Sequence, residues 1–351
     1  MTMTIDPGLA NRETATFHAP VPMPVIPPPP SVAMKRLTAS RLSDTDIAAV
    51  LAAYGLCVVG MWSVHGGLTK LSNGWAQAWT SVTSLSGLLT SAVALLALVL
   101  VGRPLSLERR FGLDRMFVWH RILGDLMGLL LAVHVAAGTI AWAADSGWIN
   151  AIIDLTGRTP YMALAFVGSL LFGVVTISSL KSIRQKFSYE TWYFVHMLAY
   201  VGMAVSFGHE IYLGSDLASD NVARWFWVGM HIAVLALMVF SRWGRTLKAV
   251  VRPLRITSIE NVGHKTVAIE VSGKSLHHRE GDAGQFCFVR PMKKGLWWQS
   301  HPYSVSAAPF VEGLRFTFDI GDDAKSFRRI APGTRVWLEG PYGTFTADKV
   351  G

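Results

Sequence analysis

The sequence is poor in charged residues and in cysteine. Charged residues make up 16% of its 351 residues and apolar residues 51%, a balance far from that of a soluble domain. It has 2 cysteines, Cys57 and Cys287, and no CxxC pair or metal-ligand spacing, which argues against a disulfide framework or a zinc site. No internal repeat and no Gly-rich strand-to-helix turn of the dinucleotide-binding type occurs. The composition predicts a membrane protein.

The N-terminal segment has the composition of a disordered tail. Residues 1–34 are rich in proline, including the run Pro27 to Pro30, and contain no apolar core long enough for a signal peptide. We expect residues 1–45 to form a disordered cytoplasmic tail.

Long apolar stretches dominate the middle of the chain. Each is close to the roughly 20 residues that an α-helix needs to cross the hydrocarbon of a bilayer. They predict an all-α bundle of six membrane-spanning helices over residues 46–243. The stretches are Ile47 to Val64, Val82 to Val101, Met116 to Trp142, Tyr161 to Leu180, Trp192 to Leu213 and Val222 to Phe240.

The positive charges predict the orientation of these helices. Short loops rich in Lys and Arg stay on the cytoplasmic side, and clusters of them precede the first stretch and follow the second, fourth and sixth. The net charge of +9 is therefore explained by membrane topology rather than by nucleic-acid binding. We expect a multi-pass protein of the plasma (inner) membrane with both ends in the cytoplasm. The clustered residues are Lys35, Arg36, Arg41, Arg103, Arg109, Arg110, Arg115, Lys181, Arg184, Lys186, Arg242, Arg245, Lys248, Arg252 and Arg255.

After Pro253 the pattern changes to short alternating segments bounded by Gly, Pro and Asn. Such segments are typical of strands, and they predict a small antiparallel β-barrel over residues 250–351. One short helix, Asp322 to Ile330, is expected to interrupt it. The expected strands are Leu254 to Ile259, Thr266 to Val271, Gln285 to Val289, Tyr303 to Ser306, Leu314 to Ile320 and Arg335 to Leu338.

Four histidines lie inside two of the apolar stretches. His120 and His134 are separated by about 21 Å along the third predicted helix, and His196 and His209 by roughly 20 Å along the fifth. Both helices run outward, so the four residues form two pairs at matching depths. Because a haem iron can take two axial imidazoles from opposite sides, each pair could hold one b-type haem. A histidine in hydrocarbon needs partners for its ring nitrogens, which makes it a functional candidate.

The helical phase of the fifth stretch does not favour this pairing. At about 100° per residue, His120 and His134 return to within about 40° of one face, whereas His196 and His209 miss by about 140°. Gly202 and Gly208 lie between the latter two, and we predict a kink or π-bulge there.

The alternative is that these histidines serve only in packing. Four at paired depths favour ligands, whereas His65 and His231 are interpreted as structural. Arg121 and Asp125 lie one helical turn apart and could form an ion pair. Arg121 could instead bind a haem propionate.

Residues 301–306 read HPYSVS and follow the Trp-rich segment GLWWQS, while GPYG ends the expected barrel at residues 340–343. With the four histidines and the Gly284-Gln285-Phe286 strand entry, these motifs resemble the ferric reductase and NADPH oxidase superfamily. The resemblance covers residues 47–351. It implies a six-helix domain with two bis-histidine haems followed by a ferredoxin-reductase-like FAD-binding barrel.

The resemblance also implies the residues that contact FAD, with Tyr303 against the isoalloxazine ring. A helix N-terminus near Asp322 would receive the pyrophosphate, although Asp322, Asp323 and Ala324 depart from the usual pattern there. The expected FAD contacts are Gln285, His301, Pro302, Tyr303, Ser304, Ser306, Gly321, Lys325 and Ser326.

The function implied by the resemblance is electron transfer from NADPH through FAD and the two haems to an acceptor outside the membrane. No catalytic acid, base or nucleophile is required. Oxygen, giving superoxide, is slightly favoured over ferric ion as the acceptor. The nicotinamide-binding domain expected after the barrel is absent from this sequence, so electrons could come from a missing domain or a partner dehydrogenase. The rivals are a non-catalytic cytochrome b subunit that carries electrons and a haem-free transporter.

Overall fold

The computed structural model describes residues 43–244, 247, 251, 254–263, 266–273, 276, 285–296, 300–307, 313–319 and 330–343. The predicted tail over residues 1–45 lies outside this part except for its last three residues. The expected helix from Asp322 to Ile330 also lies outside it, Ile330 excepted.

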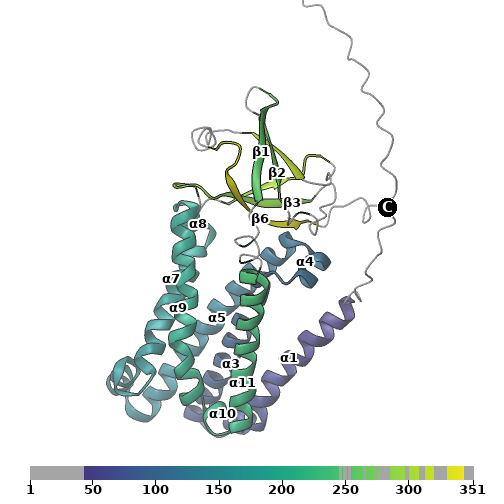
Figure 1. Ribbon diagram of the computed structural model, residues 1–351. Helices are drawn as coiled ribbons and strands as arrows, with labels where there is room; N and C mark the ends of the chain where they lie inside the picture. Colours follow the sequence, from purple (N-terminus) through teal and green to yellow (C-terminus); the bar gives the residue numbers. More distant parts are fainter. Residues whose placement is uncertain are drawn as a thin grey trace, which may run out of the picture. The chain divides into compact units, whose positions relative to one another are not determined.

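Long helices make up most of the described chain (Figure 1). Hydropathy and length qualify five segments as membrane spans: Thr45–Val64, Trp75–Gly102, Leu113–Ser146, Met162–Ser179 and Asn221–Ser241. The prediction of six spans is not reproduced on this measure. The fifth predicted stretch does form a helix, but histidines and glutamates reduce its apolar character. The long helices are α1 (Asp44–Val64), α3 (Trp75–Gly102), α5 (Leu113–Ser146), α7 (Met162–Ser179), α9 (Tyr189–Leu213) and α11 (Asn221–Met238).

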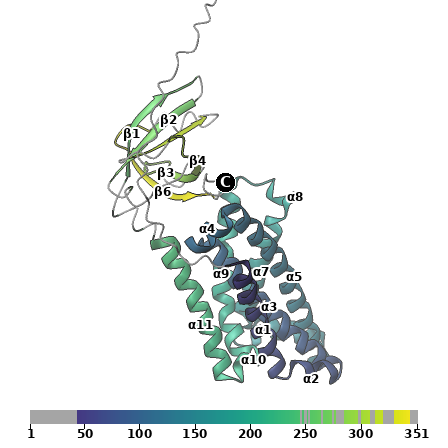
Figure 2. The ribbon, with the colours of Figure 1, turned by 90° about the vertical axis from the view of Figure 1, so that its right-hand side faces the viewer.

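Short helices connect the long ones. In Figures 1 and 2, α4 and α8 lie at one end of the bundle, and α10 lies at the other. Segments expected to be loops are thus partly helical. The short elements are α2 (Gly67–Ser72), α4 (Leu105–Phe111), α6 (Trp148–Ile153), the π-helix η1 (Asp154–Arg158), α8 (Lys181–Arg184), α10 (Ser215–Ala218) and the π-helix η2 (Val239–Trp243).

Side-chain caps fix where several helices begin. Ser43 and Asp46 form a reciprocal capping box at the start of α1, and Ser188 accepts a hydrogen bond from the backbone N–H of Thr191 in α9. Asp220 accepts from the backbone N–H groups of Val222 and Ala223 at the start of α11. These side chains satisfy N–H groups that have no partner within their own helices.

Small residues let the long helices pack closely. A Cβ on Gly168 of α7 would lie 2.1 Å from Ser206 Oγ of α9, and one on Gly128 of α5 would lie 2.8 Å from Thr176 Cγ2 of α7. Close approach at small residues provides the packing contacts that hold helices together in a bilayer, where water drives no apolar association.

The C-terminal strands form one antiparallel sheet in the order β4-β3-β6-β1-β2-β5. Alternate residues point to its buried face, including Val289, Phe316 and Leu338. An isolated bridge between Val305 and Phe316 joins the chain just after β4 to β5, so the two edges of the sheet meet there. The strands are β1 (Leu254–Asn261), β2 (Thr266–Ser272), β3 (Phe286–Pro291), β4 (His301–Ser304), β5 (Gly313–Asp319) and β6 (Arg335–Tyr342).

Candidate functional site

The four candidate histidines meet in two pairs between α5 and α9. The ring centroids of His120 and His196 are 6.0 Å apart with an interplanar angle of 76°. Those of His134 and His209 are 6.1 Å apart at 69°. His120 and His196 lie near the helix starts that follow α4 and α8, whereas His134 and His209 lie toward the opposite end of the bundle.

Three of these rings have a partner for Nδ1. His120 Nδ1 lies 3.2 Å from the carbonyl oxygen of Ala97, and His134 Nδ1 lies 2.9 Å from that of Thr83. His196 Nδ1 lies 3.4 Å from Ser179 Oγ. A ring whose Nδ1–H donates to such an oxygen keeps Nε2 as the nitrogen available to bind metal.

His209 differs from the other three. Its Nδ1 is buried and has no hydrogen-bond partner among the residues that the structure describes. A buried ring nitrogen without a partner is costly, and the described residues offer Nδ1 no contact that would fix the tautomer of this ring.

The spacing of both pairs fits a metal held between two imidazoles. A metal–imidazole bond is about 2 Å long, and a ring nitrogen lies about 1 Å from its ring centroid, so two opposed ligands have centroids about 6 Å apart. In the described part of the chain, no group of three or more His, Cys, Asp or Glu side chains could hold a metal ion. Two protein ligands per centre would complete the coordination of a porphyrin-bound iron, since its macrocycle supplies the other four.

The predicted π-bulge in the fifth long helix is wrong, while the alternative of a kink stays a prediction. Residues 189–213 form one continuous α-helix without a π segment. The prediction assumed that both rings project straight from one face. An imidazole stands away from the helix axis and can take several rotamers, so His196 and His209 each pair with a histidine of α5 without a π segment between them.

Gly87 is a site residue that sequence reasoning missed. A Cβ at this position of α3 would lie 2.9 Å from both Cε1 and Nδ1 of His134. The missing side chain therefore makes room for the imidazole. No sequence pattern marks Gly87, because the requirement comes from the neighbouring helix α5.

The two remaining histidines of the bundle have polar partners, as expected for structural residues. His231 Nδ1 lies 3.0 Å from the carbonyl oxygen of Trp227, and its Nε2 lies 3.8 Å from Glu210 Oε2. Trp227 is fully buried and donates its indole N–H to Glu210. These contacts tie α9 to α11 beside His209.

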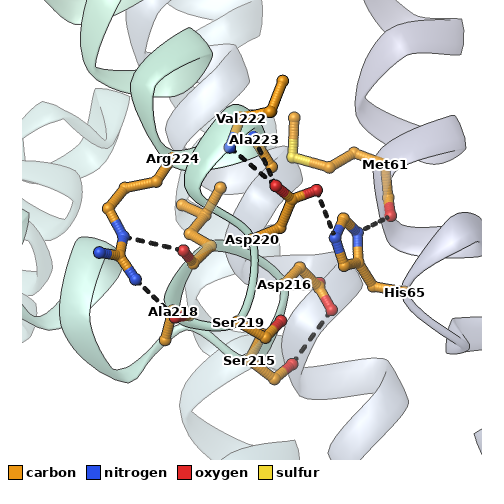
Figure 3. A network of polar contacts seen from close by, with 11 residues as sticks. Met61, His65, Ser215, Asp216, Ala218, Ser219, Asp220, Val222, Ala223 and Arg224 are labelled. Carbon is orange, nitrogen blue, oxygen red and sulfur yellow. Dashed lines mark hydrogen bonds and ion pairs between the residues drawn. The ribbon is translucent and has the colours of Figure 1, made fainter.

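A second polar network links α1, α10 and α11 (Figure 3). His65 Nε2 lies 3.2 Å from Asp220 Oδ2, and its Nδ1 lies 2.6 Å from the carbonyl oxygen of Met61. Buried Asp216 accepts hydrogen bonds from the hydroxyls of Ser84 and Ser215. The backbone N–H of Val222 is the main cause that lowers the pKa of Asp220 below its ordinary value, and His65 adds to it.

Arg121 and Asp125 make no ion pair with each other in the described part of the chain, and both are exposed. The packing interpretation of Arg121 as half of an ion pair is therefore wrong. Its proposed contact with a haem propionate stays a prediction.

The HPYS motif forms strand β4. The Tyr303 ring stacks on Phe318 of β5 at 4.1 Å with an interplanar angle of 14°, and the His301 ring lies 6.0 Å from Tyr303 at 15°. Pro302 and Ser304 are exposed. His301 and Tyr303 are half-buried on the opposite face of the strand, where Tyr303 packs against the hydrophobic core of the sheet.

The other expected flavin contacts are only partly visible. Ser306 Oγ donates to the carbonyl oxygen of Arg315 at 3.1 Å, and the Gln285 side-chain amide donates to that of Gly343 at 3.2 Å. Gln285 thus links the start of β3 to the GPYG motif. The remaining candidates, Gly321, Lys325 and Ser326, lie outside the described residues.

Arg103 joins the end of α3 to strand β6. Its guanidinium lies 3.0 Å from Glu339 Oε1, and the Phe117 and Phe288 rings are each 5.3 Å from its Cζ. Tyr342 donates its hydroxyl to the same Glu339 oxygen at 2.7 Å. An ion pair enclosed by aromatic rings is screened less than an exposed one.

Comparison with known proteins assigns both parts of the chain. Residues 86–207 match the family "Ferric reductase like transmembrane component", and residues 251–346 match "FAD-binding domain". The first match includes three of the four paired histidines and ends two residues before His209. The second includes the HPYSVS and GPYG motifs.

Curated relatives come from Saccharomyces cerevisiae. "Ferric/cupric reductase transmembrane component 2" is 23% identical over 275 residues, covering 75% of this chain and 36% of the relative. "Ferric reductase transmembrane component 3" is 24% identical over 273 residues, with the same coverage. The chain thus spans about a third of the length of these relatives. Among solved structures, a flavohemoglobin from Malassezia yamatoensis with bound FAD and heme is 15% identical, with a TM-score of 0.29, covering 78% of this chain and 66% of that one.

These findings define a multi-pass membrane protein with a transmembrane domain of the ferric reductase type and a following FAD-binding domain. The chain fits the ferric reductase and NADPH oxidase superfamily, which confirms the family expected from its motifs.

Proposed function

We propose that this protein carries electrons from reduced FAD on the cytoplasmic side, through two b-type haems, to ferric ion on the outer side. In this proposal α9 also crosses the membrane, which makes six spans in all, and the helices would enclose both haems. The observation that supports it best is the pair of centroid separations, 6.0 Å for His120–His196 and 6.1 Å for His134–His209. Two centres stacked along the helix direction would divide one long transfer into shorter steps.

The protein's own residues have mainly binding and positioning roles. His120 and His196 would hold the inner haem, and His134 and His209 the outer one. The haem irons supply one-electron redox chemistry when bound. The two imidazoles of each pair would be the ligands that the protein supplies to its haem, and no side chain would be needed to bring an acceptor onto the iron. No side chain needs to act as an acid or base.

The flavin would bind along the HPYS strand. Tyr303 would lie against the isoalloxazine, where an aromatic face excludes water and influences the flavin potential. FAD supplies the conversion of a two-electron hydride donor into single electrons. NADPH is the proposed donor, delivered either by a domain linked to this one or by a partner dehydrogenase.

Orientation follows from charge. The end of the bundle where α4 and α8 lie also carries four basic residues, and such clusters stay in the cytoplasm. These residues are Arg110, Arg115, Lys181 and Arg184. Both chain ends would then lie on that side, and His134 and His209 would lie near the outer face.

Ferric ion is preferred to oxygen as the acceptor because the curated relatives are named as ferric or ferric/cupric reductases. The purified protein is first reduced without oxygen, and a ferric chelate is then added. The chelate should reoxidise the haems and be reduced to ferrous ion. Reoxidation by oxygen alone, with a ferric chelate inert, would favour superoxide production instead.

The haem assignment is tested by absorbance spectra of the purified protein before and after anaerobic reduction. His134→Ala and His196→Ala should each lose one haem, and a different one. His231→Ala is the matched control, because its ring belongs to neither pair; it should retain two haems. Wild-type protein without a Soret band, despite adequate haem supply during expression, would contradict the proposal and support a haem-free transporter.

The source of electrons separates an enzyme from a carrier subunit. Prompt haem reduction when NADPH is added to the purified chain would exclude the carrier function. Reduction only after a dehydrogenase is added would establish it.

A further inference from the structure

The hydrogen-bond partners of Nδ1 differ in kind among the paired histidines. His120 and His134 are held by backbone carbonyl oxygens, those of Ala97 and Thr83. His196 is held by a side chain, the hydroxyl of Ser179. Among the four paired histidines, His196 is therefore the one whose Nδ1 partner in the described part of the chain can be removed by a side-chain substitution.

Ser179 is itself held by a tryptophan that packs on the same imidazole. The indole N–H of Trp192 donates to Ser179 Oγ at 3.4 Å, and the Trp192 and His196 rings stack with centroids 5.0 Å apart at 27°. The Arg184 guanidinium carbon Cζ lies 4.6 Å from the centroid of the Trp192 ring. A hydroxyl oxygen has two lone pairs, so Ser179 can accept from both His196 and Trp192.

We propose that Ser179 and Trp192 are positioning residues for His196, and that Ser179 lowers the midpoint potential of the inner haem. This inference rests on the proposed haem-binding function. With Nε2 as the iron ligand, His196 Nδ1 would carry a hydrogen and donate a hydrogen bond to Ser179 Oγ. That hydrogen bond makes the imidazole more basic and so stabilises ferric over ferrous iron.

The stacking contact acts on geometry rather than on charge. Trp192 lies against the face of His196 and so limits rotation of its ring about χ2, which is a broad torsion in histidine. The hydroxyl of Ser179 then meets Nδ1 in one ring orientation. Both contacts come from the end of the bundle where α8 leads into α9.

The test compares Ser179→Ala with Ser178→Ala by anaerobic spectroelectrochemical titration of both haems. Ser178 is the matched control, since it is adjacent and buried and donates its hydroxyl to the carbonyl oxygen of Val175 at 2.9 Å. Ser179→Ala should shift the midpoint of one haem to a more positive potential and leave the other unchanged. Ser179→Thr, which keeps a hydroxyl, should restore the wild-type midpoint.

Repeating the titration in a His134→Ala background identifies the affected centre, because only the inner pair remains there. The shift should persist in that background. Two bound haems with wild-type midpoints in Ser179→Ala would overturn this inference while leaving the proposed function intact. Equal shifts in Ser178→Ala and Ser179→Ala would also overturn it. Wild-type protein that binds no haem would instead refute the proposed function, and this inference with it.

Discussion

Replacing Gly87 by alanine should remove the outer haem selectively. The added Cβ would lie 2.9 Å from Cε1 and Nδ1 of His134, whereas ordinary contact begins at 3.4 Å. The imidazole would therefore have to move by about 0.5 Å, more than the roughly 0.2 Å within which metal–ligand distances are held. Its Nδ1 is also held by Thr83 at 2.9 Å, so the movement strains that hydrogen bond.

The assay is the ratio of haem to protein, measured together with a reductive titration of the purified variant. Gly87→Ala should fall from two haems toward one, and the remaining centre should titrate as the inner haem of wild type. Gly55→Ala is the control, since a Cβ there meets nothing within 4 Å and alanine favours a helix over glycine. A Gly87→Ala protein with two haems and wild-type midpoints would refute the reasoning, because His134 would then have no need of the space.

Three further outcomes are expected. Arg103→Glu should slow reduction of the inner haem by flavin without loss of either cofactor. The double variant Arg103→Glu with Glu339→Arg should recover part of this rate in stopped-flow measurements. No recovery would mean that the 3.0 Å ion pair between Arg103 and Glu339 does not couple the transmembrane helices to the FAD-binding domain. Phe316→Ala should destabilise the FAD-binding domain by about 3–5 kcal/mol, because the ring is fully buried in the sheet core; thermal unfolding followed by flavin fluorescence measures this, and a change below about 1 kcal/mol would contradict it. The pKa of Asp220 is lowered in the folded protein, so its contribution to stability is present above the unfolded pKa of about 3.9 and is lost as pH falls through the folded pKa. The difference in melting temperature between wild type and Asp220→Ala should therefore be constant at neutral pH and shrink below about pH 4. A difference that grows on acidification would contradict this sign.

Periodicity and composition predict the repeating parts of this fold well. The apolar stretches become α1, α3, α5, α7, α9 and α11, and the alternating segments become β1 to β6 within a few residues. The apolar stretches and the alternating pattern both arise from burial of a whole segment or of one face, and each can be recognised from neighbouring residues in the sequence. The connecting helices α2, α6 and α10 have no such periodicity, and they were expected to be loops.

The candidate site was less predictable because its details depend on neighbouring helices. The depth of the four histidines could be calculated from helical rise. Their approach to 6 Å depends instead on how α3 and α7, against which α5 and α9 pack, place these two helices. Glu108 was not singled out at all, yet it is 3% exposed and accepts a hydrogen bond from the backbone N–H of Gly343. Charged residues are seldom buried without a partner, and that partner lies far away in the sequence.

The steep angles between the paired imidazoles, 76° and 69°, have a spectroscopic consequence. When two axial ring planes are crossed, their π interactions fall on different iron d orbitals and leave those orbitals close in energy. The two proposed haems, in their ferric form, should then give strongly anisotropic low-spin electron paramagnetic resonance signals rather than the rhombic signals of parallel ligand planes. The mutual twist of the rings would be readable in frozen solution without a crystal.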